Sequence, residues 1–342
     1  MAEVLRDHTT LRLGGPARTW VRATTEDRLV DAVRRADEAG EPVLVLGGGS
    51  NLVVADEGFP GTVVEVATSG LRADAEDDDP TCGGVVVEVA AGESWDAFVA
   101  TAVERRWVGV EALAGIPGSV GATPIQNVGA YGQEVSQTLA RVRVWDRRLG
   151  GIRTFAAADC GFGYRTSRFK ADPSRHVVLG VTFQFRQGEL GAPVEYAELA
   201  RTLGVEPGAR AAMTDVRRAV LGLRGGKGMV LDPADHDTWS AGSFFTNPVL
   251  DAGRVPEGAP AWRQPDGSVK TSAAWLIEQA GFGKGYGDGA ARLSTKHTLA
   301  LTNRGDATTA VVLALAREVR DGVEARFGIR LANEPVLVGC AL

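Results

Sequence analysis

The spacing of hydrophobic and polar positions predicts several amphipathic helices. In residues 26–39, apolar side chains recur at helical spacing on one face and charged side chains occupy the other. Ser94 belongs to the residue types that cap helix N-termini, and the pattern after it predicts a helix through Arg105. Further helices are predicted at residues 198–203, 214–223, 270–281 and 308–327.

Short apolar runs bounded by glycine predict β-strands between these helices. Two of them, Val43–Leu46 and Leu52–Val54, flank a glycine-rich loop. Other runs of this kind lie at residues 61–66, 84–89, 142–145, 177–185 and 331–338. Because the predicted strands and helices interleave irregularly, the sequence favours an α+β fold over a doubly wound parallel sheet.

The loop Gly47-Gly48-Gly49-Ser50-Asn51 follows the first of these strands. A dinucleotide-binding Rossmann loop requires a helix directly after it, whose N-terminal N–H groups hold the pyrophosphate. Here a second strand follows instead. Two interpretations therefore stay open: a nest of backbone N–H groups that binds a diphosphate, or a simple hairpin turn.

Three other stretches stand out by composition. Residues 109–134 are punctuated by glycine and proline and yet are apolar, which is typical of a segment buried against a ligand. Residues 225–243 are again rich in glycine and would suit a domain boundary. The acidic residues 72–83 are expected to form a solvated loop or hairpin tip.

Composition and charge exclude several functional classes. The 342 residues are 44% hydrophobic and 23% charged, which excludes wholesale disorder and suits about two domains. The net charge of −6, without a basic stripe, argues against a nucleic-acid partner. No apolar stretch approaches the roughly 18 residues of a membrane span.

Cysteine and histidine usage gives no sign of a disulfide framework or a metal site. The three cysteines are far apart in the sequence, which is typical of a reducing compartment. Residues 1–13 do not resemble a signal peptide, so we expect a cytoplasmic protein. The four histidines have no ligand spacing, and we predict no metal.

Several motifs of the chain occur in the order found in one known family. The run from Ile116 to Gly132, together with Gly47–Asn51, resembles the flavin-binding half of the UDP-N-acetylenolpyruvoylglucosamine reductase family, within the FAD superfamily of vanillyl-alcohol oxidase type. Residues 194–199 resemble the tyrosine-bearing loop of the family's type I branch, which closes over substrate. Pro335 departs from the family, which usually has valine there. Further matching segments lie at residues 163–167, 242–248, 267–270 and 331–334.

The resemblance implies both a fold and an activity. It implies a two-lobed FAD-binding region, with residues 1–72 (completed by 334–342) and residues 73–228 as its lobes, and an α+β substrate-binding domain at residues 229–333. The implied enzyme binds FAD, takes hydride from NADPH and reduces the enolpyruvyl ether of UDP-N-acetylglucosamine-enolpyruvate. The product, UDP-N-acetylmuramate, is a peptidoglycan precursor. The expected partners are these small molecules, and the chain is expected to be a monomer.

Three residues match the family's catalytic groups. Arg165 is implied to stabilise the negative charge that develops on the substrate carboxylate, for which a forked guanidinium is suited. Ser243 is implied to donate the proton, a role that requires polarisation by a neighbour such as Lys227 because serine is a weak acid. Glu334, protonated or paired with Arg165, is implied to assist.

The remaining implied residues bind the cofactor or the substrate. Glycine is needed where the backbone approaches a diphosphate, because a Cβ would hold the backbone away. The implied FAD-binding residues are Gly47, Gly48, Gly49, Ser50, Asn51, Ile116, Pro117, Gly118, Ser119, Gly121, Ala122, Thr123, Ile125, Gly129 and Arg224. The implied UDP-sugar-binding residues are Tyr131, Tyr196, Lys227, Asn247 and Lys270.

Two other functions stay open at this stage. One is a different oxidoreductase of the same flavin superfamily, acting on another sugar or alcohol with oxygen as acceptor. The other is a nucleotide-sugar-binding protein without redox activity, because glycine-rich nests and cationic side chains bind phosphate whatever the chemistry.

Overall fold

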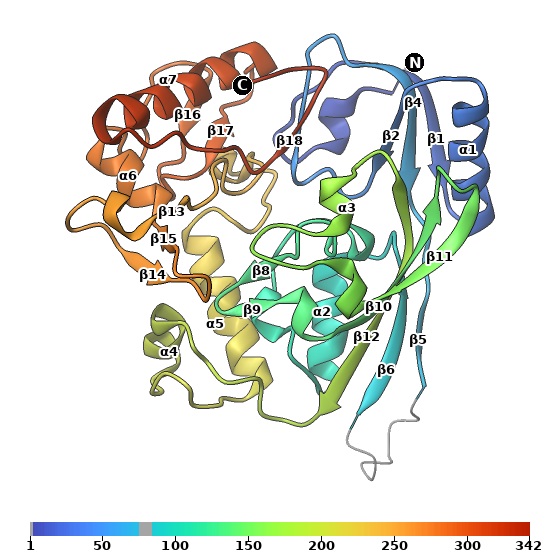
Figure 1. The fold of residues 1–342 in the computed structure, drawn as a ribbon, viewed down its shortest axis with the longest axis horizontal. Helices are drawn as coiled ribbons and strands as arrows, with labels where there is room; N and C mark the ends of the chain where they lie inside the picture. The colour runs from blue at the N-terminus through green and yellow to red at the C-terminus, as the bar shows by residue number, and fades with distance from the viewer. Residues whose placement is uncertain (1–2, 75–83) are drawn as a thin grey trace. The chain divides into compact units, whose positions relative to one another are not determined.

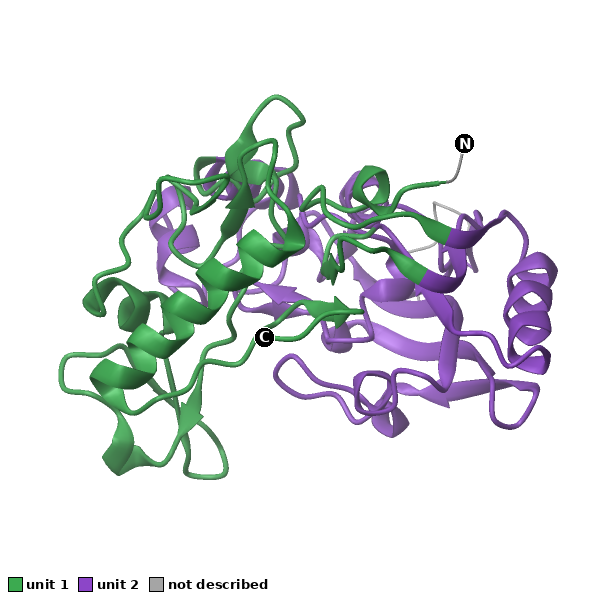
Figure 2. Ribbon diagram, turned by 90° about the horizontal axis from the view of Figure 1, so that it is seen from above, with its two compact units in different colours: residues 1–17, 49–59, 226–342 green, residues 18–48, 60–225 purple. Residues whose placement is uncertain are grey.

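The computed structural model describes residues 3–74 and 84–342 of the chain. Most of the predicted acidic loop, residues 75–83, lies outside the described residues. The chain divides into two compact units, which Figure 2 colours separately. Unit 1 comprises Met1–Ala17, Gly49–Phe59 and Gly226–Leu342, and unit 2 comprises Arg18–Gly48 and Pro60–Gly225.

The larger sheet of unit 2 is antiparallel and is centred on its longest strand. This strand, β12 (His176–Gln187), pairs with β10 (Leu139–Asp146) on one side and with β6 (Val85–Ala90) on the other (Figure 1). Residues of β12 alternate between buried and less buried, as expected for a sheet with one face on a core. The sheet is completed by β11 (Gly151–Ala156), β5 (Leu71–Ala73) and β7 (Trp107–Val108).

Helix α2 (Trp95–Glu104) packs on this sheet through aromatic side chains. Ser94 caps the helix, as predicted, because its side chain accepts a backbone N–H of the first turn. Trp95 and Phe98 contact Phe183 of β12, with ring centroids 6.1 and 5.0 Å apart. All three side chains are buried, and each such burial contributes about 1.5–3 kcal/mol to stability.

A smaller three-stranded sheet lies almost entirely within unit 2. Its strands β2 (Val43–Leu46) and β4 (Phe59–Val66) run parallel, and β1 (Ala17–Ala23) lies on the other side of β4. Helix α1 (Glu26–Glu38) begins after Thr25, whose side chain caps the first turn. The apolar face of α1 predicted from the sequence is buried in the core of this region.

Unit 1 has its own apolar core, around the long helix α7 (Thr309–Phe327) and the short helix α6 (Ala273–Gln279). Strand β18 (Val336–Val338), near the C-terminus, pairs in parallel with β3 (Leu52–Val54). The other strands of unit 1 are β13 (Val249–Leu250), β14 (Ala261–Arg263), β15 (Val269–Thr271), β16 (Ala291–Leu293) and β17 (Leu301–Asn303). The remaining elements of unit 2 are β8 (Gly129–Ala130), β9 (Gln133–Glu134), α3 (Arg168–Ala171), α4 (Ala197–Leu203) and α5 (Met213–Gly226), whose last residue belongs to unit 1.

The α+β fold and most predicted elements are confirmed, but two elements were predicted too long. The helix predicted over residues 270–281 begins only at Ala273, because Ser272 is its N-cap and the residues before it form β15. The strand predicted over residues 331–338 is reduced to β18. The division into residues 1–72, 73–228 and 229–333 remains a prediction.

Candidate active site

The two glycine-rich segments nominated for FAD meet in unit 2. A Cβ on Gly47 would lie 2.6 Å from Ser119 Oγ, and a Cβ on Gly48 would lie 2.6 Å from the Cα of Gly118. At Gly48 the backbone of one segment therefore approaches the backbone of the other more closely than any side chain would allow, whereas Gly47 approaches the serine side chain. Such exposed glycine backbone fits a diphosphate, whose oxygens accept N–H groups. The loop is a connection between strands, as predicted, and no helix follows it.

The second of these segments, residues 116–123, is fixed to the polypeptide just before α2. The Gly121 N–H donates to Ala91 O and the Val120 N–H donates to Glu93 O, both at 2.8 Å. A Cβ on Gly121 would lie 2.5 Å from Ala91 Cβ, so glycine is required for this contact as well. The segment is thus held by main-chain hydrogen bonds although it contains little regular structure.

The last three residues of the Gly47–Asn51 loop belong to unit 1. Gly49 has φ +61°, and its carbonyl oxygen accepts the Thr10 N–H at 3.2 Å. The Asn51 carbonyl accepts the Val336 N–H at 2.9 Å, and Asn51 Nδ2 donates to Glu334 O at 3.5 Å. Within unit 1, the end of the loop therefore lies beside the predicted catalytic glutamate.

A tight hairpin in unit 2 presents Tyr131. Strands β8 and β9 are joined by Tyr131 and Gly132, with φ of +50° and +85°. Positive φ at both central residues is the geometry of a type I′ hairpin turn. The Tyr131 ring meets the Tyr196 ring edge to face, with centroids 5.4 Å apart. The hairpin thus brings together two residues that the resemblance assigned to substrate binding.

Arg165 contacts the same hairpin. Its Nη2 donates to Gly129 O of β8 at 2.8 Å, and its guanidinium lies 5.6 Å from the centre of the Tyr164 ring. The residue sits in a turn between Gly163 and Thr166, which pair with each other. Its φ of +53° is uncommon for a residue with a side chain, and such strain clusters at functional sites.

Asn127 joins these two turns, a role that the sequence analysis did not assign. Its Nδ2 donates to Glu134 Oε2 at 2.7 Å and to Gly163 O at 3.3 Å, and its Oδ1 accepts the Ser136 N–H at 3.1 Å. Asn127 is buried and also has a positive φ, +46°. Its place inside the Ile116–Gly132 motif was the only signal in the sequence.

Arg224 lies near the end of α5. Its burial disfavours the charged guanidinium and lowers the pKa of Arg224 to about 10. Nearby Tyr131 and Asp96 oppose this shift. Because a pKa of about 10 is well above neutrality, Arg224 remains a cation in unit 2.

Ser243 lies in unit 1 beside the strand-like segment that carries Glu334. The Glu334 N–H donates to Phe244 O at 2.8 Å, and Phe245 pairs with Asn333. Phe244 and Phe245 are buried in the core of unit 1. Their burial fixes the backbone on which Ser243 is carried.

Pro335 does not interrupt the backbone contacts of this segment. The N–H groups of its neighbours Glu334 and Val336 are both bonded, to Phe244 O and to Asn51 O. Pro335 is buried, and its carbonyl accepts Asn333 Nδ2 at 2.8 Å. Pro335, which has no N–H group, thus lies between two residues whose N–H groups are both hydrogen-bonded.

The residues nominated for the UDP group are spread over both units. Asn247 Oδ1 accepts the Ala273 N–H at 2.9 Å and so holds the start of α6. Lys270 is the middle residue of β15, between β13 and β14, and Lys227 follows α5; both belong to unit 1 and are partly exposed. Tyr196, which is 46% exposed, precedes α4 in unit 2. Arg165 belongs to unit 2, whereas Ser243 and Glu334 belong to unit 1.

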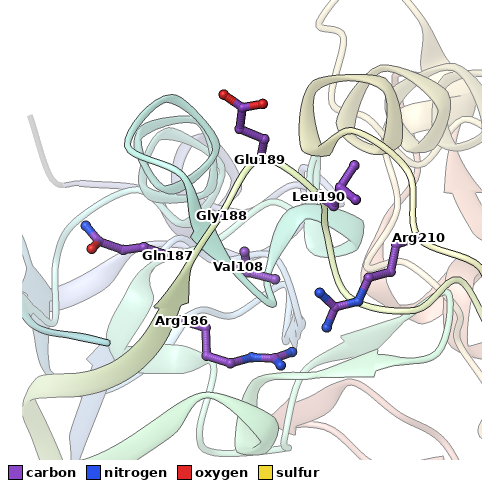
Figure 3. A pocket seen from close by; sticks show the side chains of 7 residues that line it. All are labelled: Val108, Arg186, Gln187, Gly188, Glu189, Leu190 and Arg210. Atoms are coloured by element: carbon purple, nitrogen blue, oxygen red, sulfur yellow. The ribbon is translucent and has the colours of Figure 1, made fainter. Parts of the chain in front are cut away.

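A pocket of about 390 Å³ opens at the end of β12 (Figure 3). None of the residues nominated from the sequence lines it. Its lining residues are Val108, Arg186, Gln187, Gly188, Glu189, Leu190 and Arg210.

Among residues 3–74 and 84–342, neither a membrane-spanning helix nor a cluster of metal-ligating side chains occurs. No helix in that part of the chain combines the length and apolarity that crossing a membrane requires. No three histidine, cysteine or acidic side chains of those residues are grouped so that they could hold a metal ion.

Comparison with known families matches both halves of the chain. Residues 232–338 match the C-terminal domain of UDP-N-acetylenolpyruvoylglucosamine reductase, and residues 17–156 match an FAD-binding domain. The chain is 61% identical to the UDP-N-acetylenolpyruvoylglucosamine reductase of Cutibacterium acnes, over 98% of this chain and 89% of that protein. It is 58% identical to the Streptomyces coelicolor reductase, over 98% and 88%.

The fold is also that of a solved structure. The crystal structure of UDP-N-acetylenolpyruvylglucosamine reductase from Thermus caldophilus superimposes with a TM-score of 0.64 and 27% sequence identity. The similarity covers 99% of this chain and 98% of that one.

Proposed function

Because the chain belongs to the UDP-N-acetylenolpyruvoylglucosamine reductase family, we propose how its own residues carry out the family's reaction. The chain is an FAD-dependent oxidoreductase that uses NADPH. It reduces the enolpyruvyl ether of UDP-N-acetylglucosamine-enolpyruvate to UDP-N-acetylmuramate, a peptidoglycan precursor. The residue roles below are our proposal, as are a monomeric state and a cytoplasmic location.

We propose that the glycine backbone at Gly47–Gly48 and Gly118–Ser119 holds the FAD diphosphate. The close approach of these segments, which any Cβ would prevent, supports this assignment. The other FAD-binding residues are those named from the resemblance, including Ile125, Gly129 and Arg224. When bound, FAD supplies hydride transfer from NADPH to the methylene carbon of the enolpyruvyl ether.

Arg165 is proposed to stabilise the carboxylate as it takes up negative charge. The hydrogen bond from Nη2 to Gly129 O fixes one edge of the guanidinium, so the group is oriented before substrate binds. A preorganised cation of this kind stabilises a developing charge without reorganisation during the reaction. Because the guanidinium is a rigid fork, a lysine would not reproduce this contact.

Ser243 is proposed to donate the proton to the carbon that bears the carboxylate, with Glu334 beside it. Phe244 directly follows Ser243, so the hydrogen bond from Glu334 N–H to Phe244 O supports a joint role for Ser243 and Glu334 in unit 1. A serine hydroxyl donates a proton efficiently only when a neighbour polarises it, and Lys227 is proposed for this role.

The UDP-sugar is proposed to bind through Tyr131, Tyr196, Lys227, Asn247 and Lys270. The edge-to-face contact of the two tyrosine rings supports a common role for them. The lysines offer positive charge to the diphosphate, and residues 229–333 are proposed as the substrate-binding domain.

The cradle formed by Gly47, Gly48, Gly118 and Ser119 carries the flavin part of this proposal, and a Ser243→Ala variant tests the catalytic part. We expect NADPH to bleach the flavin band of this variant at the wild-type rate. Its reoxidation by the enolpyruvyl UDP-sugar should be slowed by about 10²–10⁴-fold. The control is Ser174→Ala, which removes an exposed serine hydroxyl in unit 2. Equal losses in both half-reactions would contradict the role of Ser243 as proton donor.

A further inference from the structure

Glu111 is a fully buried carboxylate that the proposed mechanism does not use. It is 0% exposed, and its oxygens accept three N–H groups. Oε2 accepts the Gly109 N–H at 2.7 Å, and Oε1 accepts Gln133 Nε2 at 2.9 Å and the Ala192 N–H at 2.6 Å. Among residues 3–74 and 84–342, no ion pair involves Glu111, so these donors alone compensate its burial.

Two of the three donors come from the segments that carry the tyrosines. Gln133 lies in β9, two residues after Tyr131, and its Oε1 also accepts the Ala112 N–H at 2.8 Å. Ala192 lies four residues before Tyr196. The carboxylate of Glu111 therefore joins the Tyr131 hairpin to the segment that leads to Tyr196. Figure 1 labels the hairpin strands β8 and β9 and the helix α4 that follows Tyr196.

The chain around Gly191 is shaped to receive this carboxylate. A Cβ on Gly191 would lie 2.6 Å from Glu111 Oε1 and 3.2 Å from its Cδ, so an alanine there would displace the side chain. The segment is closed on itself by hydrogen bonds from Gly191 N–H to Ala211 O and from Val194 N–H to Ala209 O, at 2.9 and 2.8 Å. Glu111 is the side chain that fastens this closed loop to the hairpin.

The three bonds also explain why the residue is a carboxylate. An ionised carboxylate only accepts hydrogen bonds, so it can satisfy three converging donors. A glutamine of the same size would turn an NH₂ group toward at least one of them, leaving a buried donor unpaired.

We propose that Glu111 is a positioning residue that holds the Tyr196 segment against the Tyr131 hairpin and thereby sets the affinity for the UDP-sugar. The inference rests on the proposed function, which gives Tyr196 its role in substrate binding. Loosening the segment removes binding contacts with the UDP-sugar, whereas the cradle at Gly47–Gly48 and Gly118–Ser119 proposed for the FAD diphosphate gives no hydrogen bond to Glu111. The effect therefore falls on the KM for the UDP-sugar, whereas a general loss of structure would also reduce flavin retention and the NADPH reaction.

Two variants test this from opposite sides of the contact. Glu111→Gln removes one acceptor, and Gly191→Ala places a methyl group against the carboxylate. Both are expected to raise the KM for the enolpyruvyl UDP-sugar by about tenfold or more, because the lost buried hydrogen bond to a charged group lowers the population of the held Tyr196 segment by about that order. NADPH oxidation with an artificial electron acceptor should stay at the wild-type rate.

Gly188→Ala is the matched control, because a Cβ there would meet Val108 at an ordinary 3.7 Å. It should leave the KM unchanged. If Tyr196→Phe raises the KM while neither Glu111→Gln nor Gly191→Ala does, the positioning role of Glu111 is wrong. If Tyr196→Phe itself leaves the KM unchanged, the premise that Tyr196 binds substrate fails, and the proposal fails with it.

Discussion

At the scale of single residues, backbone strain gathers where the sequence motifs are densest. Asn127, Tyr131 and Arg165 all have left-handed φ, of +46°, +50° and +53°. Each such residue costs about 1–3 kcal/mol and persists only when its surroundings determine it. Here the surroundings are specific hydrogen bonds and ring contacts around one hairpin. The sequence motifs identified Tyr131 and Arg165, but nothing in the chemistry of these side chains predicted a left-handed backbone.

A Gly48→Ala variant tests the glycine cradle directly. The added methyl group would approach the Cα of Gly118 to 2.6 Å, so the two segments must separate. We expect the purified variant to retain much less flavin than the wild type, measured as the ratio of visible to ultraviolet absorbance. The control is Gly222→Ala in α5, where a Cβ meets nothing within 4 Å. Full flavin retention by Gly48→Ala would contradict the assignment of this cradle to FAD.

At the scale of helices and strands, local sequence signals were sufficient to predict where a helix begins when the capping residue and the hydrophobic periodicity agree. Thr25 and Ser94 cap α1 and α2, and each helix starts within a residue of its prediction. The strands β13 to β17 were missed because each has only two or three residues, and none contains three consecutive apolar residues as Leu52–Val54 does. The start of α6 was predicted at Lys270, which is too early, because Ser272 was not identified as the N-cap.

The ion pair between the buried Asp146 of β10 and the partly exposed Arg175 predicts a pH-dependent stability. Hydrogen bonds from Arg175, and from the backbone N–H groups of Arg148 and Leu149, hold the pKa of Asp146 below its ordinary value. A lowered folded-state pKa contributes stability that is present above the unfolded pKa and is lost as pH falls through the folded one. Asp146→Asn should therefore reduce the free energy of unfolding by about 2 kcal/mol at neutral pH.

The urea unfolding midpoint, compared at neutral pH and at about pH 3 or below, checks this prediction. The difference between variant and wild type should shrink as pH falls below the unfolded-state pKa of about 3.9, because protonation of the carboxylate removes the stability that its lowered folded-state pKa contributes. Glu88→Gln removes an exposed ion pair with Arg72 and should change stability by less than about 0.5 kcal/mol. A difference for Asp146→Asn that is independent of pH would contradict the role of the charge.

At the scale of the whole molecule, the chain passes between the two units more than once. Residues 1–17 and 49–59 belong with the C-terminal part, and β3 pairs with β18 across nearly the full length of the sequence. Local periodicity cannot report such pairing, because it depends on residues that are distant in sequence. The order of the motifs was still sufficient to identify the family, and the Glu111 contact became visible only once the structure had brought residues 133 and 192 together.

An anaerobic visible spectrum of the purified protein, titrated first with NADPH and then with the enolpyruvyl UDP-sugar, tests the central claim most directly. We expect a flavin band that bleaches with NADPH and returns with the UDP-sugar in the absence of oxygen. A band that returns only when air is admitted would contradict the proposed acceptor and indicate an oxidase of the same superfamily. The absence of any flavin band would contradict the redox function itself and favour a nucleotide-sugar-binding protein.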